Sequence, residues 1–165
     1  MTTEETHAQG KTLAGRPING EIRYYARSNE EQRPILELVA LLDEAFTHPE
    51  VKAIRWRAYT PYWNDGSPCV FHVSDCGFLF EGADENDGDH EDGFIEPSMV
   101  DWYRKEDNDP NYLSAITPKI VMATEKVEDA LHSGHYNVEL LEYFGDPAQV
   151  TATREGFDVE DYEHE

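Results

Sequence analysis

The clearest hydrophobic pattern in the chain has helical spacing and begins after Pro34. Apolar residues recur every three or four positions from residue 35 to residue 46, with Glu37 and Glu44 on the other side. Pro34 suits the first turn of a helix, whereas Pro49 cannot continue one. We therefore predict a helix that ends near His48 and packs its apolar stripe on a sheet.

An alternating pattern follows in residues 51–59. Ile54, Trp56 and Ala58 fall on one face, and Arg55 lies with the polar positions of the other. Because side chains alternate across a strand, this pattern predicts a strand with one buried face.

Residues 69–73 and 76–80 are also β-prone, and the two residues Ser74-Asp75 separate them. This arrangement predicts a hairpin with Ser74-Asp75 as its turn. In such a hairpin, Cys69 would lie about 13 Å from Cys76, which excludes a disulfide between them. His72 would point to the opposite face, so a shared zinc site is not expected.

The second half of the chain carries further helix and turn signals. Thr117-Pro118 combines a capping residue with a proline at the first helical position, and Gly134 ends the apolar pattern that follows. Residues 138–144 predict a second, short helix that Gly145 stops. Residues 149–162 predict a hairpin with Glu155-Gly156 at its turn.

The remaining segments are less regular. Residues 1–20 contain several Gly and Pro residues without periodicity and are expected to be a flexible arm. Residues 21–26 favour a short edge strand, and residues 97–105 a short helix. The order of elements predicts an α+β fold for residues 21–165, a single domain with an antiparallel sheet of about five to six strands and two to four helices packed on one face.

Charge separates the two parts of the chain. The 165 residues carry a net charge of −22, and residues 58–165 hold five Lys or Arg against 26 Asp or Glu. Such a surface repels polyanions, so direct binding to nucleic acid or to an anionic membrane is not expected. No secretory signal or long apolar segment is evident, which favours the cytoplasm.

The densest acidic segment, residues 81–93, contains seven acids and three glycines and is expected to be a mobile loop. Its spacing does not match a calcium-binding EF-hand loop. His132 and His135 flank Gly134 without an evident third ligand, so we interpret them as residues at a helix end. No metal site and no cofactor are therefore predicted.

Residues 60–68 connect two predicted strands and raise a different possibility. Asn-Asp-Gly at 64–66 is a turn signal, and prolines stand near both ends of the loop. Two readings are open: a rigid corner packed by aromatic residues, or a contact surface. The binding candidates in the second reading are Tyr59, Tyr62, Trp63, Asn64 and Asp65.

No sequence motif with a known catalytic mechanism is present. We therefore predict no catalytic residues, and an enzyme is the less favoured class.

Two segments carry a family resemblance. The stretch YTPYWNDGSPCVF (59–71) and the acidic end FGDPAQVTATREGFDVEDYEHE (144–165) resemble uncharacterised small proteins of bacteriophages and bacteria. The resemblance implies no particular activity and no residue roles. It does favour two roles for an acidic protein: a DNA mimic that blocks a host defence or replication protein, or an accessory protein that binds a host or phage protein.

Three hypotheses follow for function. The first is a non-enzymatic protein whose acidic surface engages a basic or nucleic-acid-binding protein partner. The second is a small-molecule-binding protein or enzyme with a pocket at residues 60–68, using Asn64, Asp65 and His72. The third is a phage structural or assembly accessory protein, and the sequence leaves the oligomeric state open. The acidic surface of the first hypothesis comprises Glu125, Glu128, Asp129, Asp158 and Glu160.

Overall fold

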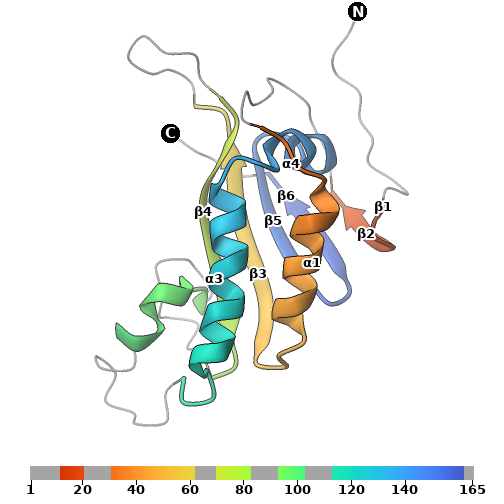
Figure 1. Ribbon diagram of the computed structural model, residues 1–165. Coiled ribbons are helices and arrows are strands. Elements are labelled where there is room, and N and C mark those ends of the chain that lie inside the picture. The colour runs from red at the N-terminus through yellow and green to blue at the C-terminus, as the bar shows by residue number, and fades with distance from the viewer. Residues whose placement is uncertain (1–11, 21–30, 62–69, 83–92, 103–112, 162–165) are drawn as a thin grey trace, which may run out of the picture.

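The computed structural model describes residues 12–20, 31–61, 70–82, 93–102 and 113–161. These residues form a six-stranded sheet with helices on one face (Figure 1). Neighbouring strands are antiparallel, except that β2 and β6 run parallel. The predicted α+β class is thus confirmed, with a mixed sheet that is mostly antiparallel. The strand order is β1 (Thr12–Leu13), β2 (Arg16–Asn19), β6 (Gly156–Glu160), β5 (Ala148–Thr153), β3 (Val51–Tyr59) and β4 (His72–Phe80).

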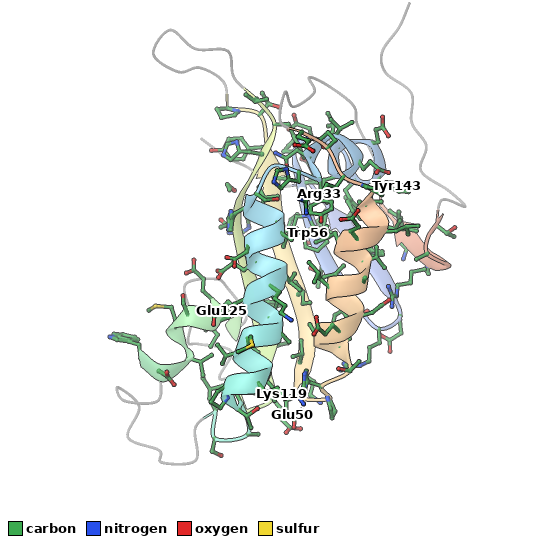
Figure 2. All side chains as sticks on the ribbon, viewed as in Figure 1. Arg33, Glu50, Trp56, Lys119, Glu125 and Tyr143 are labelled. Atoms are coloured by element: carbon green, nitrogen blue, oxygen red, sulfur yellow. The ribbon has the colours of Figure 1, made fainter. Side chains whose placement is uncertain are left out.

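The helices cover the sheet face on which the apolar strand residues lie. The described helices are α1 (Ile35–Phe46), the 3-10 turn η2 (Pro97–Met99), α3 (Pro118–His132) and α4 (Asn137–Phe144). Trp56 of β3 is fully buried and lies between α1 and α3 in Figure 2. Its ring meets Phe144 of α4 edge-on, with 5.6 Å between ring centroids, and Phe144 in turn contacts Phe157 of β6. The core therefore joins all three α-helices to the centre of the sheet.

The helices predicted from apolar spacing and capping residues are confirmed. The predicted helix after Pro34 is α1, and the helix predicted from Thr117-Pro118 is α3. The Thr117 hydroxyl accepts a hydrogen bond from the Ile120 amide, as an N-cap residue should. Gly145 follows α4 with a φ of 87°, a conformation that glycine adopts without steric cost.

The predicted hairpin at Ser74-Asp75 is wrong, because β4 is one continuous strand through both residues. It pairs with β3 along its whole length, and Arg57 stands opposite Asp75 while Ala58 stands opposite Val73. Ser74 is therefore the extra residue of a β-bulge, and its hydroxyl donates to the carbonyl of Arg57. Continuous pairing gives hydrogen bonds to more backbone groups than a two-residue turn would. The β-bulge accommodates Ser74 and Asp75 within the strand.

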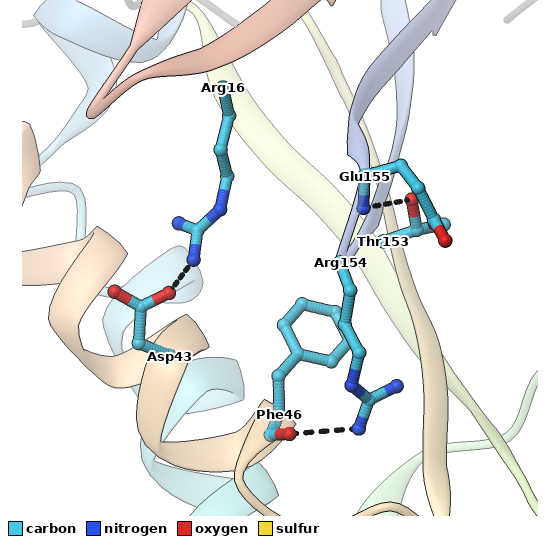
Figure 3. Close-up of polar contacts among 6 residues, drawn as sticks. All are labelled: Arg16, Asp43, Phe46, Thr153, Arg154 and Glu155. Carbon is cyan, nitrogen blue, oxygen red and sulfur yellow. Dashed lines mark hydrogen bonds and ion pairs between the residues drawn. The ribbon is translucent and has the colours of Figure 1, made fainter.

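The prediction of a flexible arm over residues 1–20 is wrong for its second half. Residues 12–19 form β1 and β2, and β2 adds to the sheet beside β6. An ion pair between Arg16 and Asp43 of α1 ties this edge to the helix layer (Figure 3). The close parallel pairing needs Gly20, where a Cβ would stand 2.3 Å from the carbonyl oxygen of Val159. Residues 1–11 and the strand expected at 21–26 lie outside the described residues.

The C-terminal hairpin is confirmed as β5 and β6, with its turn one residue earlier than expected. Thr153 pairs with Gly156, so Arg154 and Glu155 form the turn. Arg154 reaches back to the end of α1, where its guanidinium donates to the carbonyl of Phe46 and lies over the Phe46 ring (Figure 3). The hairpin tip is thereby fixed to the loop between α1 and β3.

Candidate functional site

Helix α3 separates its apolar and acidic side chains as the sequence predicts. Its buried residues face the sheet and α1, whereas Glu125 and Asp129 are exposed and Glu128 is half-buried at the boundary. Figure 2 shows Glu125 pointing away from α1, toward the segment that contains η2. The helical periodicity alone therefore brings three predicted acids to one side of the molecule.

Edge strand β4 packs beneath this side of α3. Cys76 lies on the same sheet face as its β3 partner Trp56, and its side chain is fully buried. Beyond β4, the backbones of Phe78 and Ile95 exchange two hydrogen bonds of 2.7 and 3.0 Å. This bridge brings the next residue, Glu96, to the same edge of the sheet.

Three chemically distinct side chains meet at this edge. The Cys76 Sγ atom lies 4.0 Å from a carboxylate oxygen of Glu128 and 3.8 Å from Nε2 of His132. All three ligand atoms lie within 4.8 Å of one another. Glu128 and His132 are four residues apart on α3, so both project toward β4 from one face of the helix.

The electrostatic field at this edge is strongly negative. Burial, and to a smaller extent the nearby carboxylates of Glu96, Asp129 and Glu125, together raise the pKa of the Glu128 carboxyl to about 7. Burial also raises the pKa of the Cys76 thiol well above its usual range, with Glu128 as the largest charged contributor. The neighbouring carboxylates that contribute to both shifts favour binding of a positive charge.

Positive side chains do little to offset this field. On α3, Lys126 turns to the other side of the helix and pairs with Glu44 of α1 at 3.3 Å. Across the part of the chain that the structure describes, Glu96, Glu125, Glu128 and Asp129 make no salt bridge. We call these four carboxylates the α3 acidic face.

The other two predicted acids lie elsewhere. Asp158 and Glu160 are exposed on β6, on the sheet face away from the helices. Glu160 accepts from Gln149, which in turn accepts from Arg57, and Asp158 accepts from Asn19 at 3.5 Å. The structure thus divides the predicted acidic surface into two separate groups.

Of the loop at residues 60–68, the structure describes only Thr60 and Pro61. Tyr59 is half-buried, and its ring lies 5.5 Å from the exposed ring of His72, between centroids. The backbone and hydroxyl of Thr60 both donate to the buried carboxylate of Asp146, at 3.1 and 2.6 Å. Asn137 donates to the carbonyl of Phe71 at 3.1 Å, on the far side of the loop. Both ends of the connection are therefore anchored to the segments around α4.

The other loop candidates, Tyr62, Trp63, Asn64 and Asp65, lie outside the described residues, as does Cys69. Most of the acidic segment at 81–93 does so as well. The choice between a rigid corner and a contact surface at residues 60–68 stays a hypothesis.

Comparison with family models, with curated proteins and with solved structures gave no match to this chain. No helix in the described ranges is long and apolar enough to cross a membrane.

Sequence reasoning missed the group formed by Cys76, Glu128 and His132. The spacing of Glu128 and His132 on a predicted helix was a usable signal, because residues at i and i+4 share a face. Cys76 could not be added to them, since the wrongly placed turn put it at the start of a separate strand. Only the pairing of β4 with β3, and the packing of α3 over it, brings the three together.

Proposed function

We propose that this chain is a small acidic binding protein that engages a basic protein partner through the α3 acidic face. The observation that supports the proposal is the convergence of Glu96, Glu125, Glu128 and Asp129 on one side of α3 without salt bridges among the described residues. A complementary basic surface would relieve their mutual repulsion and speed association.

The placement of these acids favours a specific surface over general solubility. A protein that imitates the phosphates of nucleic acid needs carboxylates on a rigid scaffold, and these belong to a helix and to the segment beside an edge strand. Acids that only confer solubility need not gather on one side of a helix. A decoy for a nucleic-acid-binding protein of a bacterial host is the specific form of this proposal. The resemblance to bacteriophage proteins supports this form of the proposal. The proposal also includes a location in the cytoplasm of the host.

The test compares two charge-reversed variants with equal net charge. One carries Glu125→Lys and Asp129→Lys on the α3 acidic face, and the matched control carries Asp158→Lys and Glu160→Lys on β6. Glu128 stays unchanged in both, so the group around Cys76 is not altered. Each full-length protein is used to capture proteins from a bacterial lysate at low and at high salt, after circular dichroism has established folding.

We expect a partner that binds both the wild type and the control and that high salt releases. It should bind the α3 variant at least about tenfold more weakly, because the reversed charges repel a basic surface. Equal weakening of both variants would show that only net charge matters. Weaker partner binding by the β6 variant alone would indicate that the partner contacts the C-terminal hairpin instead. Either result, or the absence of any salt-sensitive partner, would refute the proposal.

A further inference from the structure

Cys76 and His132 form a group with Glu128 of the α3 acidic face, although acidic-surface binding requires neither the thiol nor the imidazole. Cys76 is buried on β4, whereas the other two side chains reach it from α3. A thiol has one proton to donate, yet two polar groups lie about equally far from Sγ, at 3.8 and 4.0 Å. Neither distance is short enough for a strong hydrogen bond. The three ligand atoms therefore lie within 4.8 Å of one another without a strong hydrogen bond from the thiol.

The separations resemble the edges of a metal-centred tetrahedron. Zinc binds thiolate sulfur at about 2.3 Å and imidazole or carboxylate atoms at about 2.0–2.2 Å, which places sulfur about 3.6 Å from each of the other ligand atoms. The two distances from Cys76 Sγ exceed that value by a few tenths of an ångström. Because Glu128 is half-buried and His132 exposed, small side-chain rotations can close the remaining edge between them.

We propose that Cys76, Glu128 and His132 bind a zinc-type transition-metal ion, with the fourth coordination position outside this set. The ligand chemistry selects the metal, because thiolate and imidazole favour zinc and its neighbours over calcium or magnesium, which prefer oxygen ligands. The surrounding carboxylates favour a dication. Glu96 influences both Cys76 and Glu128 electrostatically, which makes it the residue to examine at the fourth position.

A nucleophilic role for the same group is a weaker interpretation. A cysteine with a histidine and a carboxylate resembles the composition of a catalytic triad, but only about 1% of Cys76 is exposed. A substrate carbonyl could not approach Sγ, whereas a single ion can enter between the side chains. The same burial suits a metal that joins α3 to the edge of the sheet and stabilises the fold on binding.

The test is a titration of the untagged full-length protein with Co²⁺, followed by competition with Zn²⁺. Cobalt is used because a bound thiolate gives an absorption band in the near ultraviolet that oxygen ligands do not give. We expect one Co²⁺ per chain with this band, displaced by one Zn²⁺, and proton release on binding because the thiol must ionise. These measurements need only the wild type, so they hold even if a core variant fails to fold.

Variants then assign the ligands. Cys76→Ser should abolish the thiolate band, and Glu128→Gln or His132→Gln should weaken zinc binding at least about tenfold, since even the loss of an outer partner of a metal ligand costs about 10–100-fold. The matched controls are Glu37→Gln on α1 and His135→Gln, which remove the same chemical groups from outside the cluster and should bind as the wild type does. Cys69→Ser, the same change at the other cysteine of the sequence, should keep the thiolate band. Absence of the band in the wild type, or binding that the three cluster variants leave unchanged, would overturn the proposal.

Discussion

The half-buried carboxyl of Glu128 should make the stability of the protein depend on pH between about 4.5 and 7. Its pKa is raised from 4.5 to about 7 in the folded chain, by burial first and then by Glu96, Asp129 and Glu125. A group with a raised folded pKa gives its full stabilisation below its unfolded pKa, and that stabilisation is lost as pH rises through 7. Glutamine imitates the neutral acid at every pH, so Glu128→Gln should remove this loss.

The magnitude follows from the size of the shift and from exposure. A change of about 2.5 pKa units at about 1.36 kcal/mol each gives an upper value of about 3 kcal/mol. Because the side chain is only half-buried, solvent screens the repulsion, and we expect about 1–2 kcal/mol. Glu128→Gln should thus match the wild type near pH 4 and exceed its free energy of unfolding by about 1–2 kcal/mol near pH 8.

Urea unfolding at both pH values, with a chelator present to remove metal, measures this difference. Glu37→Gln on the exposed side of α1 is the control for removing a carboxyl from a helix surface away from this edge. Repeating the comparison in a His132→Gln background separates the carboxyl from the neighbouring imidazole. If wild type and Glu128→Gln change stability in parallel from pH 4 to pH 8, that result would contradict a raised pKa of the Glu128 carboxyl.

Two further predictions concern the contacts that hold the fold together. Gly20→Ala should destabilise the protein by about 2 kcal/mol or more, because a Cβ there would lie 2.3 Å from the carbonyl oxygen of Val159 and the φ of 120° disfavours other residues. Thermal unfolding measures this loss. An unchanged midpoint would contradict the parallel pairing of β2 with β6. Asp146→Ala should cost about 2–3 kcal/mol, because it leaves the Thr60 amide without its acceptor near the start of the 60–68 loop. Thr60→Val is its control, since it removes only the hydroxyl donor and should cost less in the same denaturation assay.

The sequence by itself determined most of the local structure. Helices α1, α3 and α4 and strands β3, β5 and β6 are all encoded by periodicity, caps and turn residues that act over a few positions. Helical spacing also determined that Glu125 and Asp129 would share an exposed face. These features follow from sequence because each depends on interactions between residues that are close along the chain.

Tertiary structure decided the features that depend on distant partners. Ser74-Asp75 has the composition of a turn, yet β3 offers a full ladder of backbone partners and converts the pair into a bulge. Residues 12–19 have no strong periodicity and become strands because β6 presents an edge for β2 to join. In the same way, Cys76 meets Glu128 and His132 only after β4 pairs with β3 and α3 packs over it, more than 50 residues away in the sequence. The sequence supplies the ligand types, but their convergence depends on long-range packing that no local pattern encodes.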